Sequence, residues 1–61
     1  MDQEHLLRGI VKLLNAGMGS PALATAAGVA HHVVLGALAD EPLTDTEQRK
    51  LARALRRYGA L

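Results

Sequence analysis

The 61-residue chain lacks cysteine and contains a single aromatic residue, Tyr58. Without cysteine it has neither a disulfide framework nor a cysteine-ligated metal site. Eleven of its apolar residues are alanines, so the core must be thin and built mainly from Leu, Val and Ile. A chain this short buries only about 60% of its unfolded surface. We therefore expect one domain over residues 1–61 that is stabilised by self-association or a partner, with no room for an enclosed catalytic cleft.

Charge is absent from the middle of the chain, where residues 16–39 contain no Asp, Glu, Lys or Arg. An uncharged run of this length has to be tested as a membrane span. It contains Pro21, two histidines and four glycines, and its apolar residues are mostly alanine, which argues against a transmembrane helix. The N-terminus has no basic segment ahead of an apolar run, so no signal peptide is predicted. We expect a soluble cytoplasmic protein that does not bind membranes.

The first half of the chain predicts two helices. Residues 3–15 place apolar side chains at steps of three and four, with Asp2 as the cap. The second helix opens with Ser20 as its capping residue, followed by Pro21, and ends at Gly28. The apolar face expected on the first helix consists of Leu6, Leu7, Ile10, Val11 and Leu14.

The second half predicts two more helices. Residues 31–39 form the third; their apolar run also suits a strand, but no second strand is available to pair with it. Thr44 and Glu47 form a capping box that starts the fourth helix, and Gly59 ends it. The fourth helix is amphipathic, and its apolar face is expected to comprise Leu51, Ala54, Leu55 and Tyr58. The sequence therefore predicts an all-α domain of four helices.

The spacing of small and apolar residues between positions 23 and 38 is tightly constrained. Ala24 lies four residues before Gly28, Val29 follows the glycine, and Val34 comes five residues later. Two helices that cross steeply through a three-residue turn need this pattern. Ala24 lets the next helix cross over it, Gly28 makes the turn and Val29 fills the gap. The two histidines that follow are then expected to point outward.

This segment resembles the helix-turn-helix of phage-repressor-like transcriptional regulators. The match covers about residues 20–38, and the flanking helices agree with the small helical domain of that family. The buried positions of the family pattern are matched by Leu23, Ala24, Ala27, Gly28, Val29, Val34 and Leu38. The resemblance implies that residues 31–39 form the recognition helix, which enters the major groove of DNA.

The resemblance also assigns the outward positions of the recognition helix, Ala30, His31, His32, Leu35 and Gly36. Such positions usually carry side chains that pair with base edges or phosphates, and here only the two histidines can. Leu35 and Ala30 suit thymine methyl groups. Ala30 also replaces the usual Ser or Thr cap, which leaves a backbone amide for water or phosphate.

Positive charge gathers on one face of the fourth helix, on Arg49, Lys50, Arg53, Arg56 and Arg57. Cations near a helix C-terminus are favoured by the helix dipole, and such a stripe is also typical of a solvated face. Because DNA affinity is largely electrostatic, Arg49, Lys50 and Arg53 are candidate phosphate contacts. Ser20 is another candidate, since helix N-termini bind phosphate, although it is equally explained as a cap.

We therefore expect a non-enzymatic, sequence-specific regulator that binds double-stranded DNA as a dimeric repressor. A dimer would read a palindrome, with the last helix or Leu35 as its contact surface. The alternative is an adaptor or inhibitor of the same fold that binds a protein through the apolar surface around Leu35. Adjacent His31 and His32 diverge by about 100° and are not spaced for one metal ion, so neither a metal nor a cofactor is expected.

Overall fold

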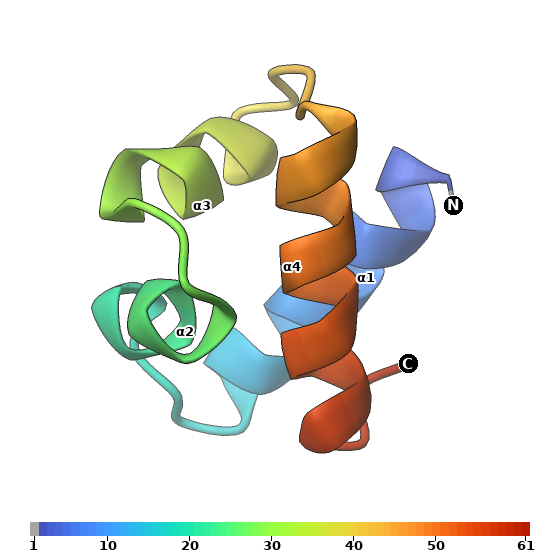
Figure 1. Ribbon diagram of the computed structural model, residues 1–61. Helices are drawn as coiled ribbons and strands as arrows, with labels where there is room; N and C mark the ends of the chain where they lie inside the picture. Colours follow the sequence, from blue (N-terminus) through green and yellow to red (C-terminus); the bar gives the residue numbers. More distant parts are fainter. Residues whose placement is uncertain (1) are drawn as a thin grey trace.

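The computed structural model describes residues 2–61, and within them it contains four helices and no strand (Figure 1). The helices are α1 (Gln3–Asn15), α2 (Ser20–Ala27), α3 (His31–Leu38) and α4 (Asp45–Arg57). In Figure 1, α2 and α3 lie on one side of the molecule and α4 lies across from them, with α1 behind it. The helices pack as α1 on α4, α2 on α3 and α2 on α4. The predicted all-α, four-helix domain is confirmed.

The two long helices begin at the predicted side-chain caps. An oxygen of the Asp2 carboxylate accepts a hydrogen bond from the Glu4 amide at 3.3 Å. At the start of α4, Thr44 Oγ1 accepts from the Glu47 amide at 3.1 Å, and the Thr44 amide donates to Glu47 Oε1 at 2.9 Å. At the start of each helix, a side chain therefore accepts a hydrogen bond from a backbone amide that would otherwise have no partner.

The two short helices begin without a side-chain cap. The sequence prediction that Ser20 caps α2 is wrong: Gly19 is the N-cap and makes no side-chain bond, while Ser20 is the first helical residue. The helix begins there because the Gly19 carbonyl already accepts the first helical bond, from the Leu23 amide at 3.0 Å. At the start of α3, Ala30 is the N-cap and likewise makes no side-chain bond, as expected.

The steep crossing of α2 and α3 is confirmed. The two helices are bent by 117° relative to each other across a turn of three residues, 28–30. Gly28 has a φ of 74°, a left-handed conformation that costs glycine little. Ala24 retains only 3% of its exposure, in keeping with its place at the crossing. His31 and His32 are both exposed, which was the expected outcome of this packing.

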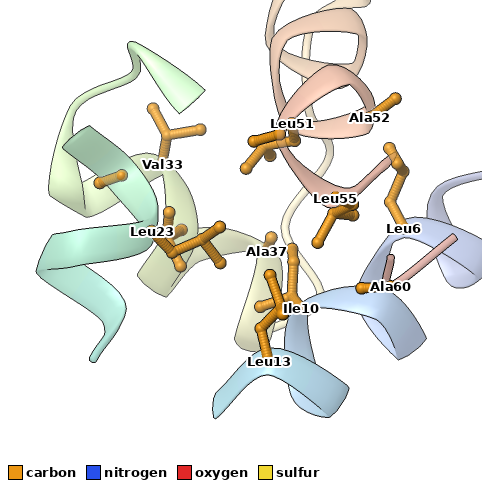
Figure 2. Close-up of a cluster of buried hydrophobic side chains, with 13 residues drawn as sticks. Leu6, Ile10, Leu13, Leu23, Val33, Ala37, Leu51, Ala52, Leu55 and Ala60 are labelled. Carbon is orange, nitrogen blue, oxygen red and sulfur yellow. The ribbon is translucent and has the colours of Figure 1, made fainter. Parts of the chain in front are cut away.

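Side chains from all four helices meet in one apolar core (Figure 2). Its largest fully buried members are Leu6, Ile10, Leu23, Val34, Leu51 and Leu55. Of the remaining positions of the sequence pattern, Ala27, Val29 and Leu38 are partly buried and packed against this cluster.

Two expectations about the apolar faces need correction. On α1 the buried residues include Gly9 and Leu13, while Val11 is exposed and Leu7 and Leu14 are only half-buried. The core-facing stripe of α1 is therefore rotated toward Gly9, where α1 approaches α4 closely. A Cβ at Gly9 would lie 3.0 Å from Leu55 Cδ1.

Tyr58, which was expected on the apolar face of the fourth helix, is 47% exposed. The helix ends at Arg57, and Tyr58 is its C-cap. Tyr58 therefore has the sequence spacing of the apolar face of α4, but it is not buried with that face.

Within residues 2–61 no single helix is both long and apolar enough to cross a membrane. Only α2 and α3 taken together pass such a test by length and composition, and they are bent by 117° at the turn between them.

Candidate nucleic-acid interface

The outward face of α3 carries the candidate reading residues. Val33, Val34 and Ala37 face the core, so the opposite side of the helix exposes His31, His32 and Leu35. Ala30, at the start of the helix, is exposed as well. Leu35 is 48% exposed, which is a large exposed fraction for a leucine. The face thus offers two imidazoles and one apolar side chain.

Gly36 is the exception among the candidate reading residues because it is half-buried. The carboxylate of Glu41 lies over it, and a Cβ at Gly36 would be 2.7 Å from Glu41 Oε1. A negative group beside this position would repel a DNA phosphate. Of the predicted set, Gly36 is therefore the residue least available to a polyanion.

A hydrogen bond joins the first residues of the two short helices. Ser20 Oγ and His31 Nε2 lie 2.8 Å apart. Either the hydroxyl donates to the ring nitrogen or the protonated nitrogen donates to the hydroxyl, depending on the tautomer. In both cases the bond fixes the orientation of the His31 ring against α2. Ser20 and His31 are therefore parts of one exposed polar pair at the α2–α3 edge.

Lys50 is the α4 cation that reaches this edge. Its Nζ donates to the Gly28 carbonyl in the α2–α3 turn at 3.5 Å. Lys50 and His32 also border one open hollow of about 370 Å³ between the turn and the starts of α3 and α4. The hollow is lined by Gly28, Val29, Ala30, His32, Val33, Thr44, Thr46, Glu47 and Lys50.

Arg49 and Arg53 lie elsewhere on α4. They border a second open hollow, of about 530 Å³, which is lined only by residues of α4. These are Asp45, Gln48, Arg49, Ala52, Arg53 and Arg56. The structure therefore divides the predicted phosphate contacts between two surfaces, with Lys50 beside the turn and the two arginines around a different hollow.

Within residues 2–61 the basic side chains of α4 form no ion pair with a carboxylate. Among residues 2–61 the one ion pair is Glu4 with Arg8, at 3.2 Å on the surface of α1. Of the α4 cations, Arg49 donates to Thr46 Oγ1 at 3.5 Å and Lys50 to the Gly28 carbonyl. Neither acceptor is charged, so the positive charge of α4 is available to an anionic partner.

Sequence reasoning missed the contacts that hold Glu41 over α3. Gln3 donates to the Glu41 carbonyl at 2.6 Å and accepts from the Leu43 amide at 3.0 Å. These bonds tie α1 to the loop between α3 and α4. The partners are 38 and 40 positions apart, so no local pattern in the sequence could have indicated the contact.

The described residues contain no group of three or more His, Asp or Glu side chains that could hold a metal ion. The Ser20–His31 pair has the spacing of a nucleophile and a base. The structure gives His31 no carboxylate to orient it, and neither residue borders the hollows described above.

Comparisons of the chain with models of protein families, with curated proteins and with solved structures found no match. The surface chemistry of α2, α3 and α4 therefore carries the functional proposal.

Proposed function

We propose that the chain is a helix-turn-helix domain that binds double-stranded DNA sequence-specifically and represses transcription by occupying its operator as a dimer. The observation that carries this proposal is the α2–α3 edge. There two short helices cross at 117° through a three-residue turn, and the Ser20–His31 hydrogen bond joins their exposed starts. DNA-binding helix-turn-helix domains have this crossing and turn length, and they place their second helix in the major groove.

In this mechanism α3 lies in the major groove and its first turns read the bases. His32 donates to the N7 or O6 of guanine, as does His31 Nδ1 when the Ser20 hydroxyl donates to His31 Nε2, and Leu35 packs on a thymine methyl group. The uncapped start of α2 presents amides to a phosphate beside Ser20. Ala30 leaves the start of α3 equally open, which suits a close approach to the DNA backbone.

Electrostatic attraction comes from α4. Lys50 is beside the turn and contacts a phosphate next to the groove that α3 reads. The α4 arginines contribute to the field that attracts the duplex from a distance. Because only a few phosphates are contacted, we expect modest affinity with a measurable dependence on salt.

The dimer would use an apolar surface outside the groove. Tyr58 and Leu61, 47% and 37% exposed, are large apolar side chains near the C-terminal end of α4. Leu35 is the other candidate for dimer contact, but it lies on the reading face. The two recognition helices of a helix-turn-helix dimer read half-sites about one helical turn of DNA apart, and we expect the same spacing here.

Fluorescence anisotropy with a duplex selected from a randomised pool tests this function. We expect saturable binding that weakens measurably as salt rises. Replacing both His31 and His32 by Ala should reduce discrimination between the selected and a scrambled duplex, at about 1–3 kcal/mol for each lost base contact. His5→Ala, on the exposed surface of α1, is the matched control. Absence of binding at low salt, or an affinity indifferent to salt, would reject the proposal.

A second candidate function is recognition of a protein through the surface around Leu35. It is favoured by the exposed leucine, by the Glu41 carboxylate over Gly36 and by the absence of Lys and Arg from α2 and α3. Two substitutions separate the candidates. Lys50→Ala should weaken DNA binding, whereas loss of function with Leu35→Ala and none with Lys50→Ala indicates a protein partner.

A further inference from the structure

Three arginines occupy the side of α4 opposite the core. At about 100° per residue, Arg49, Arg53 and Arg56 fall within about 60° of one another and face away from Leu51 and Leu55. Figure 2 shows these two leucines pointing from α4 into the core that α4 shares with α2 and α3. The arginines therefore point away from α2 and α3, and we call Arg49, Arg53 and Arg56 the arginine face.

We propose that the arginine face binds the phosphate backbone of a second DNA segment, so that one domain bridges two duplexes. This inference rests on the proposed function, because it takes the α2–α3 edge as the surface that holds the first duplex. The activity it adds is the joining of two DNA segments.

The arginine face borders the hollow of about 530 Å³ on α4, and the chemistry of this hollow favours phosphate as the ligand. No carboxylate pairs with the three guanidinium groups in the described residues, and guanidinium is suited to bidentate contacts with phosphate oxygens. From Arg49 to Arg56 the helix rises about 10 Å, which spans about three nucleotide steps along one strand. One carboxylate, that of Asp45, borders the hollow at the N-terminal end of α4, so the surface keeps a net positive charge.

The same hollow is poorly suited to an apolar protein surface. Its one apolar lining residue is Ala52, which is only 4% exposed. Protein interfaces draw most of their binding energy from buried aromatic and apolar anchors that fill pockets on the partner. A shallow, basic surface with no apolar anchor site matches an extended polyanion better.

The exposed side of α3 and the arginine face are too far around the molecule from each other to bind one straight duplex, so the proposal requires two DNA segments. The described part of the molecule measures 25 × 20 × 19 Å, and its apolar core separates the outer side of α4 from the exposed side of α3. A straight duplex seated on α3 contacts Lys50 at the turn and leaves the arginine face free.

The test is capture of a second, labelled duplex by protein already bound to an immobilised duplex. The variant carries Arg49→Gln, Arg53→Gln and Arg56→Gln, which removes the guanidinium groups from exposed sites of a helix without introducing a poor helix former. We expect second-duplex capture to fall by about tenfold or more and its salt slope to fall by about three. Circular dichroism confirms that the variant remains folded.

A matched control removes the same charge from other surfaces. Arg8→Gln, Lys12→Gln and Arg57→Gln replace three exposed cations outside the arginine face. This control should retain second-duplex capture, and both triple variants should bind the first duplex with similar affinity. Capture that survives loss of the arginine face, or falls equally in both variants, would overturn the proposal, as would no capture by the unaltered protein.

The His31→Ala, His32→Ala variant separates this inference from the proposed function. If this variant loses sequence discrimination but still captures the second duplex, the result supports both the proposed function and the bridging. Unchanged discrimination in that variant, with capture still dependent on the arginine face, rejects α3 as the reading surface and leaves the arginine face as a phosphate-binding surface. If loss of the arginine face abolished binding of the first duplex as well, a single surface would bind all DNA and the bridging would be wrong.

Discussion

The long helix pair and the short helix pair of this domain are built by different means. Helices α1 and α4 have 13 residues each, side-chain caps at their starts and charged outer faces. Helices α2 and α3 have eight residues each, no side-chain cap and no Asp, Glu, Lys or Arg. Helices this short are not stable by themselves in water. The short pair therefore depends on the packing of α2 against α4 and of α2 against α3.

The proposed function uses the helix pair that is less stable by itself. Uncapped helix starts leave backbone amides free for a ligand, and an uncharged helix surface allows close contact with a groove. The long pair supplies the opposite properties, a rigid frame and positive charge. The contrast predicts that loss of a buried side chain unfolds the domain, whereas changes at the exposed side chains of the short pair affect mainly the proposed interface.

The largest effect is expected from Leu55→Ala. Leu55 is fully buried in the core and also contacts Gly9 at the close approach of α1 and α4. Removing this side chain should cost about 2–5 kcal/mol. A domain of this size has a total stability of about 3–9 kcal/mol, so much of the protein should be unfolded. Urea denaturation measures the loss.

Leu35→Ala is the matched control for Leu55→Ala, because the same side chain is removed from an exposed position of the short pair. Its free energy of unfolding should stay within about 0.5 kcal/mol of the unaltered protein. Similar losses for the two variants would contradict the division between frame and interface.

The next effect tests the crossing itself. Ala24→Leu adds three carbons at a core position of α2 that is 3% exposed and that the sequence pattern assigns to the crossing with α3. Overpacking of this kind costs about 1–3 kcal/mol and should shift α3 relative to α2. Ala22→Leu makes the same change at an exposed site of α2 and should have little effect on the free energy of unfolding. If the two variants have equal free energies of unfolding and equal DNA affinities, the crossing of α2 and α3 does not require a small residue at position 24.

Much of the fold could be predicted because its signals are local. The capping box of Thr44 and Glu47, the glycine at 28 and the helical spacing of apolar residues fixed the helices within about a turn. The rotation of α1 could not be predicted in the same way. Its apolar residues cover too much of the circumference to define one face, and the close approach to α4 at Gly9 decides which of them are buried.

Less of the candidate site could be predicted. Exposure of both histidines follows from the spacing around Ala24 and Gly28, and the structure bears this out. The cap assigned to Ser20 was wrong because Gly19 takes the cap position and leaves the hydroxyl for His31. Helical periodicity places Lys50 about 100° from Arg49 around α4. That Lys50 is the residue that reaches the α2–α3 turn depends on how α4 packs against α2, which periodicity does not set.

The smallest effect comes from giving α3 the cap that it lacks. Ala30 has the extended backbone of an N-cap residue, with φ −68° and ψ 150°, so a serine there can accept a hydrogen bond from the start of the helix without strain. Ala30→Ser should stabilise the domain by about 0.5–1 kcal/mol, and thermal unfolding detects the gain. Ala22→Ser, at the exposed third residue of α2 and not at a cap position, should give no gain. If the open start of α3 receives a phosphate, the new hydroxyl competes for the same amide, so the more stable variant should bind DNA more weakly. A gain in both stability and DNA affinity would contradict this role for the uncapped helix start.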